Sequence, residues 1–295
     1  MSPPPLLVVA GPTGAGKSAV AIAIARRFDA VVVSADAMQV YAGMDVGTAK
    51  VPRAERLGVP HYGLDVVLPD EDFDVASFLE LVDAARRSHE RVVVVGGTHF
   101  YLAALVRGLV DLPRPDPALR AALEREPDLH GWLARVDPAL ALRLAPRDRV
   151  RLVRGLEVVL ATGVPLSEHH RRHQLAPVAT HVVGLTIDRA DLDERIDQRI
   201  VNMDAEGYRD EVEGLLAAGY TRSLRSMRSL GYRHVARAVA EGTSWAAALD
   251  ETARDTRRFA RKQRTWLRSL GWPALDGASP DRAVDAAGRL WGAAR

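Results

Sequence analysis

The sequence predicts an α/β fold in which helices flank a parallel β-sheet, with an all-helical insertion near the middle of the chain. Three observations support this prediction. Short apolar, β-branched runs alternate with segments of helical periodicity, the first run leads into a glycine-rich loop, and a proline-rich stretch interrupts the alternation. Such alternation is typical of parallel strands joined by helices that cover both faces of the sheet.

Most of the predicted sheet comes from the first part of the chain. Apolar runs predict strands at residues 6–10, 30–33 and 92–95, and apolar residues at helical spacing predict helices at residues 18–28 and 100–106. In an open parallel sheet, ligands bind beyond the carboxyl ends of the strands. We therefore expect the functional site just after residues 10, 33 and 95.

The pattern changes after residue 112. Pro113, Pro115 and Pro117 are expected to prevent regular structure, residues 118–162 are helical throughout in their periodicity, and a loop follows at residues 163–165. Sheet-like sequence returns at residues 181–187, and the pattern is helical from residue 191 onward. We therefore predict a core of residues 1–112 and 178–295 and a helical insertion domain of residues 113–177.

Composition excludes several classes of protein. None of the 295 residues is cysteine, which excludes disulfides, thiolate chemistry and zinc sites with cysteine ligands. No apolar stretch approaches the roughly 20 residues of a membrane span, and residues 1–5 lack the features of a secretory signal. We expect a cytoplasmic protein without membrane contact. No obligate protein partner is evident, so a monomer is expected.

Charge is segregated along the chain although the formal net charge is only +2. Residues 1–112 carry 10 basic and 13 acidic side chains (−3), residues 178–221 carry 4 and 10 (−6), and residues 222–268 carry 12 and 4 (+8). Only Lys17, Lys50 and Lys262 among the 40 basic residues are lysines, so lysine is an unusual choice in this chain. The +8 segment is the natural candidate for binding a polyanion.

The glycine-rich loop at residues 11–18, GPTGAGKS, fits the P-loop pattern G-x-x-x-x-G-K-[ST] between a predicted strand and a predicted helix. Its glycines allow backbone N–H groups to surround phosphate oxygens, Lys17 reaches a terminal phosphate, and Ser18 can bind Mg²⁺. The predicted fold is therefore a P-loop NTPase-like parallel sheet. A P-loop indicates phosphate, however, and does not by itself indicate ATP.

Asp36 is the carboxylate that follows a predicted strand on the same edge of the sheet. A nucleotide hydrolase usually has an aspartate after a later strand, where it helps to hold Mg²⁺. Here the run at residues 92–95 ends instead in Gly96, Gly97 and Thr98. Asp36 could be a base that acts on an acceptor, or a loop carboxylate that caps backbone N–H groups.

A longer series of motifs resembles the signature of tRNA dimethylallyltransferases, also called tRNA isopentenyltransferases. The series includes SADAMQVY (34–41), GMDVGTAK (43–50), His61 with Leu64-Asp65, GGT (96–98), RLVRGLEV (151–158), LGYR (230–233) and RKQRTWLR (261–268). These motifs occur in the family's order from residue 11 to residue 268. The lack of cysteine points to the bacterial type, because eukaryotic relatives carry a zinc finger.

The resemblance implies transfer of a dimethylallyl group from dimethylallyl diphosphate to N6 of the adenosine just 3′ of the anticodon, with release of pyrophosphate. Mg²⁺ is the implied cofactor, bound at Ser18. Asp36 resembles the general base, Thr98 a residue that contacts the target nucleotide, and Lys17 completes the catalytic set. The implied ligands of the donor diphosphate are Gly11, Pro12, Thr13, Gly14, Ala15, Gly16, Lys17, Ser18 and Arg199.

The implied macromolecular partner is the anticodon stem-loop of tRNA. On a helix, Arg257, Arg261, Arg264 and Arg268 would form one stripe, with Phe259, Trp266 and Leu270 on an opposite apolar side. Arginine is suited to bidentate contacts with phosphate. The full set expected to contact tRNA is Asp36, Ala37, Met38, Gln39, Thr98, Arg120, Val150, Arg151, Leu152, Val153, Arg154, Arg228, Gly231, Tyr232, Arg233, Arg257, Arg261, Arg264 and Arg268.

Two departures and three alternatives stand beside this interpretation. The family commonly has serine where this chain has Ala37, and the pair His99-Phe100 is less usual. The alternatives are prenylation of free adenylate, a P-loop small-molecule kinase, and an RNA-binding regulator without catalytic activity. A free adenylate needs neither the insertion nor the +8 segment, a kinase lacks its carboxylate after Val95, and a regulator does not need Asp36.

Overall fold

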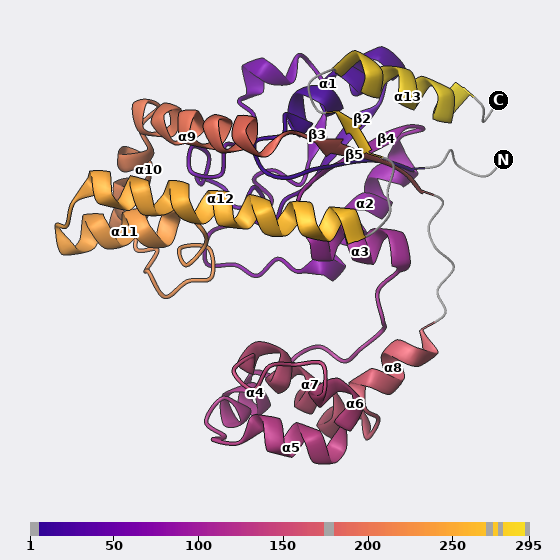
Figure 1. Ribbon diagram of the computed structural model, residues 1–295, viewed down its shortest axis with the longest axis vertical. Coiled ribbons are helices and arrows are strands. Elements are labelled where there is room, and N and C mark those ends of the chain that lie inside the picture. Colours follow the sequence, from indigo (N-terminus) through magenta and orange to yellow (C-terminus); the bar gives the residue numbers. More distant parts are fainter. Residues whose placement is uncertain (1–5, 174–179, 270–273, 277–279, 293–295) are drawn as a thin grey trace. The chain divides into compact units, whose positions relative to one another are not determined.

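A parallel sheet organises the larger part of the computed structural model, which describes residues 6–173, 180–269, 274–276 and 280–292. The described strands follow the order β3-β2-β4-β1-β5-β6, and every pairing is parallel (Figure 1). Their bounds are β1 (Leu6–Ala10), β2 (Val31–Ala35), β3 (His61–Tyr62), β4 (Val92–Gly96), β5 (Thr180–Thr186) and β6 (Ala274–Asp276).

Helices cover both faces of the sheet, as predicted. Leu7 and Val9 of β1 pack in one core with α1 (Lys17–Phe28) and α13 (Pro280–Gly292). Leu6 and Val8 point to the opposite core, which contains α2 (Val75–Ser88) and α3 (His99–Arg107). Because successive side chains of a strand point to opposite faces, runs of valine and leucine with no polar alternation fit a sheet buried on both sides.

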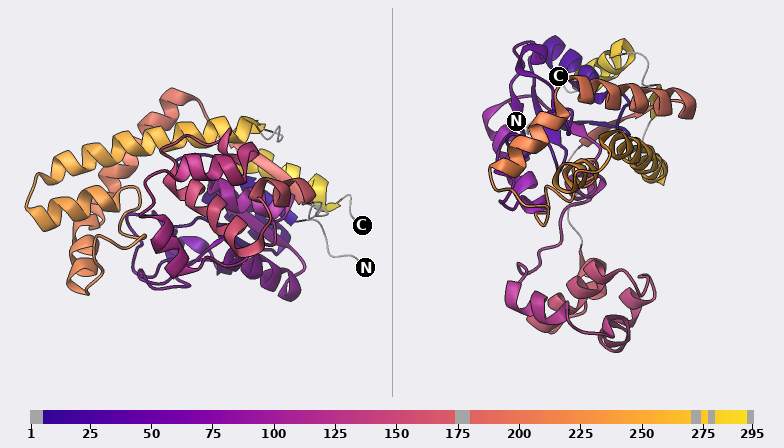
Figure 2. Two further views of the ribbon diagram at one scale, coloured as in Figure 1. Left: turned by 90° about the horizontal axis from the view of Figure 1, so that it is seen from below. Right: turned by 90° about the vertical axis from the view of Figure 1, so that its left-hand side faces the viewer.

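The C-terminal part adds four helices beside the sheet (Figure 2). They are α9 (Arg189–Ala205), α10 (Tyr208–Ala217), α11 (Tyr232–Glu241) and α12 (Trp245–Ser269), and α12 packs against both α9 and α11. The expectation of helix alone after residue 191 was wrong at β6, which pairs with the end of β5. β6 has only three residues, too few for strand alternation to be visible in the sequence.

Residues 107–176 form a second compact unit, and residues 1–106 and 177–295 form the first. The second unit contains α4 (Pro117–Leu123), α5 (Leu129–Val136), α6 (Pro138–Ala141), α7 (Arg149–Thr162) and α8 (Leu166–Arg172). Its core is a separate cluster of leucines and valines that includes Leu133, Leu152 and Leu156.

The sequence predicted one helical stretch from residue 118 to 162, and the structure has four helices there. An aspartate precedes each helix and caps it: Asp116, Asp128, Asp137 and Asp148 accept hydrogen bonds from N–H groups of the first turn. Pro117 does not prevent regular structure, because it occupies the first helical position of α4, where no backbone N–H is needed. The loop predicted at residues 163–165 is present, and Gly163 ends α7 with a φ of 70°.

No helix within the described residues is long and apolar enough to cross a membrane.

Candidate active site

The carboxyl ends of three neighbouring strands meet at one edge of the sheet. β1 ends at Ala10 and leads into the glycine-rich loop, β2 ends at Ala35 before Asp36, and β4 ends at Gly96 before Thr98. β4 lies between the other two strands in the sheet. The adjacency of these ends brings together segments that are far apart in the sequence.

A cavity of about 410 Å³ opens at this edge. It is lined by eleven residues that the sequence had singled out: Thr13, Lys17, Ser18, Asp36, Ala37, Met38, Gln39, Thr98, Arg199, Gly231 and Tyr232. Residues that received no role at the sequence level also line it, among them His99, Thr252, Thr256, Phe259 and Gln263. Pro12 of the glycine-rich loop instead borders a neighbouring cavity of about 250 Å³.

The glycine-rich loop has the backbone conformation of a phosphate cradle. Gly14 and Gly16 have φ values of 83° and 81°, which side-chain-bearing residues rarely adopt. Gly16 directly precedes α1, so the N-terminal N–H groups of that helix face the loop. Lys17 folds back so that its Nζ donates to the carbonyl oxygen of Pro12 at 2.8 Å.

The protonation state of Lys17 depends on its surroundings. Burial lowers the pKa of its ammonium group to about 8, the Asp36 carboxylate raises the pKa, and the Arg199 guanidinium lowers it. A bound anion would favour the protonated form. Lys17 is therefore a cation whose charge an arriving diphosphate would stabilise.

Asp36 begins a turn after β2, and Thr98, which follows β4, supports that turn. Asp36 Oδ1 accepts a hydrogen bond from the N–H of Met38 at 2.8 Å, and Thr98 Oγ1 accepts one from the N–H of Ala37 at 3.0 Å. Asp36 therefore caps its own loop, as one of the two interpretations expected. Its Oδ2 makes no hydrogen bond within the described residues, so this oxygen is available to a substrate in the cavity.

Arg199 of α9 connects the glycine-rich loop to the segment after β2. Its Nη1 donates to Thr13 Oγ1 at 3.3 Å, and its Nη2 donates to the carbonyl oxygen of Thr48 at 3.1 Å. With Lys17 it gives the cavity two cations from different elements. The arrangement suits an anion with several oxygens, such as a diphosphate.

Gln263 of α12 is a site residue that the sequence reasoning missed. Its Oε1 accepts a hydrogen bond from the N–H of Thr13 at 2.9 Å, and its Nε2 donates to the carbonyl oxygen of Gly97 at 2.8 Å. The side chain is buried between the loops that follow β1 and β4. In the sequence, the only hint of this role was a single uncharged glutamine within an arginine-rich segment. Its burial, which requires hydrogen-bond partners, is visible only in the structure.

The arginine stripe on α12 has two different parts. Arg257 pairs with Asp197, and Arg261 lies 4.0 Å from Asp193, so acidic side chains of α9 offset both charges. Arg264 and Arg268 make no ion pair with the described residues, and they line the 250 Å³ cavity beside Pro12. The stripe is therefore free for an external anion mainly at its C-terminal end.

The apolar side predicted for α12 was partly wrong. The buried face consists of Ala248, Thr252, Thr256, Ala260 and Gln263, mostly small or polar residues that allow close packing on the sheet edge. Phe259 is 41% exposed and borders the active-site cavity, while Trp266 is only partly buried and packs against the core. Leu270 lies outside the described residues.

The segment that leads into α11 was expected to contact tRNA, and several of its polar groups already have partners within the protein. Gly231 and Tyr232 line the cavity, but the Tyr232 hydroxyl already donates to Glu211 at 2.5 Å. Arg233 is paired with Asp255. Arg228 is exposed and has no ion pair within the described chain.

Within the helical unit, two residues that were predicted to contact RNA are buried. Leu152 and Val153 are 0% and 3% exposed because they form the inner face of α7, so their side chains face the core of this unit. Val150 and Arg151 on the outer face are exposed. Arg120 makes two hydrogen bonds to Glu157, at 2.8 and 2.7 Å, and Arg154 donates to the carbonyl oxygen of Pro113 at 2.9 Å.

The cavity fits a magnesium ion only when phosphate oxygens complete its coordination. No group of three or more histidine, cysteine, aspartate or glutamate residues among the described residues could hold a metal. Ser18 and Asp36 line the same cavity and offer oxygen ligands. Mg²⁺ often binds with few protein ligands and takes the others from substrate phosphates and water.

The parallel sheet, the glycine-rich loop after β1 and the helices on both faces define a P-loop-like α/β protein. Comparison with known sequences gives the family. The profile of the IPP transferase family matches residues 39–270, and that of the isopentenyl transferase family matches residues 4–61. The chain belongs to the IPP transferase family.

Individual relatives agree with this assignment. The chain is 43% identical over 276 residues to a protein of Geobacter metallireducens named tRNA dimethylallyltransferase, with 89% of each chain covered. A protein of Geobacter sulfurreducens with the same name is 42% identical, with 89% of this chain and 88% of that protein covered.

Solved structures give the same fold. The tRNA isopentenylpyrophosphate transferase of Bacillus halodurans matches with a TM-score of 0.70 and 30% identity, covering 98% of this chain and 96% of that one. A eukaryotic dimethylallyltransferase described as acting on tRNA matches with a TM-score of 0.82 and 25% identity, covering 99% of this chain and 77% of that one.

The lowered pKa of Lys17 predicts a pH dependence for binding of Mg²⁺-pyrophosphate. Lys17 is protonated below about pH 8 and loses its charge as the pH rises through that value. Lys17 should therefore tighten binding by about 10- to 100-fold near neutral pH, as expected for charge-assisted hydrogen bonds, and by progressively less at alkaline pH. This contribution is measured as the ratio of the calorimetric Kd values of Lys17→Met and wild type, from neutral to alkaline pH. Titration of the ligand cancels in their ratio, and a ratio that stays constant with pH would contradict the prediction.

The buried Glu157 carboxylate predicts a structural role for Arg120. Arg120→Met removes the bidentate partner of Glu157 and leaves the buried carboxylate with only Arg154, at 3.6 Å, so it should destabilise the helical unit by about 1–3 kcal/mol. Hydrogen exchange of the α7 amides measures this loss. Arg120→Met combined with Glu157→Leu should restore most of the protection. Unchanged protection in the single variant, together with weaker RNA binding, would show that Arg120 acts on RNA instead.

Proposed function

We propose that this protein transfers the dimethylallyl group of dimethylallyl diphosphate to N6 of the adenosine 3′-adjacent to the anticodon in tRNA. Pyrophosphate is the second product. The observation that carries the proposal is one cavity lined both by two cations, Lys17 and Arg199, and by the carboxylate of Asp36. A leaving anion and a proton that must be removed need these opposite charges.

The reaction forms one bond and breaks one. The N6 nitrogen attacks the allylic carbon, the carbon–oxygen bond to the diphosphate breaks, and its electron pair leaves with the diphosphate. Asp36 accepts the N6 proton through the oxygen that is not engaged with Met38. Lys17, Arg199 and the N–H groups of the glycine-rich loop stabilise the charge that develops on the leaving group.

Mg²⁺ would be bound by Ser18 and by diphosphate oxygens, and it would neutralise part of the leaving group's charge. Thr98 holds the turn that carries Asp36 and also faces the cavity, so it can orient the target adenosine. The target base must leave its stack to reach this cavity, at a cost of a few kcal/mol. RNA contacts outside the cavity offset that cost.

Arg264 and Arg268 are the strongest candidates for those contacts, because they are unpaired within the described chain and border the P-loop side of the site. Arg228 and the exposed residues Val150 and Arg151 are further candidates in their own units. Arg257, Arg261 and Arg233 would first have to leave acidic partners.

The family assignment weakens the alternatives. The isopentenyl transferase profile covers only residues 4–61, whereas the IPP transferase profile extends through the helical unit and α12. A kinase needs a carboxylate for Mg²⁺ after a core strand, and β4 is followed by Gly97 and Thr98. A purely RNA-binding protein has no need of Asp36 opposite a phosphate cradle.

The proposal predicts the effect of removing the base. Asp36→Asn preserves the oxygen that caps Met38 but cannot accept the N6 proton, so turnover should fall about 10²- to 10⁴-fold with little change in donor affinity. The measurement is transfer of radiolabel from dimethylallyl diphosphate to bulk tRNA, with adenylate as the competing acceptor. Asp83→Asn, an exposed change on α2, is the matched control. Wild-type incorporation in Asp36→Ala would refute the assignment of Asp36.

The two parts of the arginine stripe predict different effects on RNA affinity. Replacing Arg264 and Arg268 together by alanine should weaken tRNA binding and reduce the slope of log K against log salt by about 0.7–0.9 per lost phosphate contact. Replacing Arg257 and Arg261 together by alanine should change the slope less, since Asp197 and Asp193 already offset those charges. Fluorescence anisotropy at several salt concentrations measures both. Equal slopes in the two variants would contradict the distinction.

A further inference from the structure

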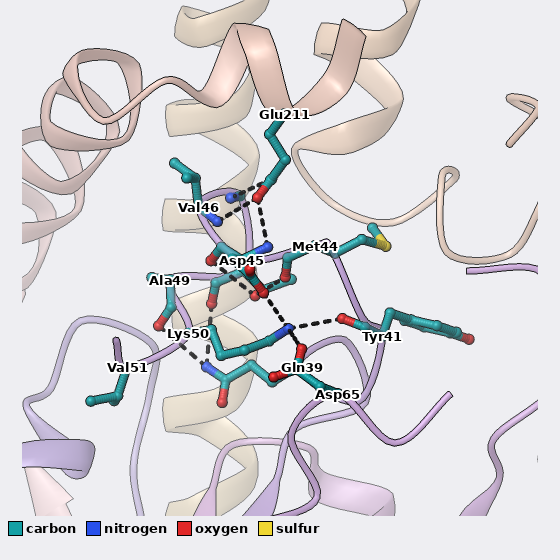
Figure 3. Close-up of polar contacts among 12 residues, drawn as sticks. Gln39, Tyr41, Met44, Asp45, Val46, Ala49, Lys50, Val51, Asp65 and Glu211 are labelled. Carbon is teal, nitrogen blue, oxygen red and sulfur yellow. Dashed lines mark hydrogen bonds and ion pairs between the residues drawn. The ribbon is translucent and has the colours of Figure 1, made fainter. Parts of the chain in front are cut away.

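The carboxylate of Glu211 on α10 accepts four hydrogen bonds. Figure 3 shows Glu211 pointing toward the loop that contains Asp45 and Val46. Oε2 accepts from the N–H groups of Asp45 at 2.6 Å and Val46 at 2.7 Å. Oε1 accepts from the N–H of Gly47 at 3.0 Å and from the hydroxyl of Tyr232 at 2.5 Å. Three consecutive backbone N–H groups that converge on one anion fix the path of the chain at that point.

The same loop is held from its other side by Lys50. Its Nζ donates to the carbonyl oxygen of Tyr41 at 2.8 Å and to the carboxylates of Asp45 and Asp65, both at 2.5 Å (Figure 3). Lys50 is 7% exposed and is one of few lysines in an arginine-rich chain. A compact ammonium directs its three donors tetrahedrally toward these acceptors, whereas the donors of a guanidinium lie in one plane.

The loop also packs tightly on aromatic rings. A Cβ atom at Gly47 would lie 2.3 Å from the Tyr208 ring and 2.6 Å from the Tyr232 ring. The backbone of residues 45–47 is therefore held between Glu211 and these rings, and it has little freedom to shift.

The next residue carries this constraint into the active site. The carbonyl oxygen of Thr48 accepts from Arg199 Nη2 at 3.1 Å and from Gln39 Nε2 at 3.3 Å. The other arm of the Arg199 guanidinium reaches Thr13 Oγ1 of the glycine-rich loop at 3.3 Å. The direction of Arg199 thus depends on where the Thr48 carbonyl lies.

We propose that Glu211 is a positioning residue for the diphosphate site. By holding the N–H groups of residues 45–47 it fixes the Thr48 carbonyl, which directs the Arg199 guanidinium toward the glycine-rich loop. Glu211 itself does not line the cavity. The inference rests on the proposed function in one respect, the assignment of Arg199 to the leaving diphosphate.

Glu211→Gln tests the inference with a side chain of the same size. A carboxylate has two acceptor oxygens, whereas an amide has one oxygen and one N–H₂ group. Some of the four donors, which are the N–H groups of residues 45–47 and the Tyr232 hydroxyl, would therefore lose their acceptor and face the N–H₂ group. Calorimetry with Mg²⁺-pyrophosphate should give a Kd about tenfold higher than wild type, while the affinity for tRNA changes less than twofold; this corresponds to the loss of one charge-assisted hydrogen bond. A merely structural role would lower both affinities together.

A double-mutant cycle with Arg199→Ala shows whether Glu211 acts through Arg199. If it does, Glu211→Gln in the Arg199→Ala background should change the pyrophosphate Kd less than threefold. Glu213→Gln on the same helix is the matched control, because Glu213 is exposed and its one ion pair among the described residues is with Arg209. Its Kd should equal that of wild type.

Two results would overturn the inference: an unchanged pyrophosphate Kd in Glu211→Gln, or single-variant effects that multiply in full in the double variant. If Glu211→Gln does not fold, Tyr232→Phe replaces it, since it removes one of the four donors and keeps the ring. A pyrophosphate Kd equal to wild type in that variant overturns the inference as well. Failure of the wild-type protein to bind Mg²⁺-pyrophosphate would instead contradict the proposed function.

Discussion

The side-chain amide of Gln263 is the interaction on which the shape of the active site depends. It joins the N–H of Thr13, after β1, to the carbonyl oxygen of Gly97, after β4, with hydrogen bonds of 2.9 and 2.8 Å. Gly97 leaves the necessary room, since a Cβ there would lie 2.4 Å from Gln263 Nε2. Because Gln263 belongs to α12, the same contact also fixes the helix that carries Arg264 and Arg268. Loss of this amide would leave buried backbone groups unpaired, at about 1–3 kcal/mol for each group.

Around this bridge, the site separates two tasks that need opposite charge. Lys17 and Arg199 supply cations next to the glycine-rich loop, and Asp36 keeps one carboxylate oxygen free at the end of β2. An enzyme that uses its P-loop to hydrolyse a nucleotide places its second carboxylate where it can hold the metal. In this chain the corresponding strand end carries Thr98, whose hydroxyl supports the turn of Asp36. This arrangement agrees with the proposed role of the cradle as the site of a leaving group.

Local signals in the sequence were sufficient for β1, β2, β4 and β5, for the glycine-rich loop and for the position of Asp36 at a strand end, because each depends on a contiguous run of residues. The strands β3 and β6, of two and three residues, gave no such signal. Local signals were also insufficient where the role of a residue depends on whether its side chain is buried. Leu152 and Val153 belong to a motif that resembles an RNA-binding segment, yet they form the inner face of α7. Arg120 was expected at an RNA and instead pairs with a buried glutamate. Gln263 and Glu211 could not be assigned from sequence, because the backbone groups that they bind lie 164 to 250 residues away along the chain.

The balance of products tests the central claim most directly. Purified protein, Mg²⁺, dimethylallyl diphosphate labelled in both its prenyl and its phosphate groups, and unmodified tRNA are combined without ATP. The account predicts one pyrophosphate released for each prenylated adenosine, with both phosphorus atoms still joined. A requirement for ATP, or phosphate label that appears in the tRNA, would show that the P-loop serves phosphoryl transfer and would contradict the account.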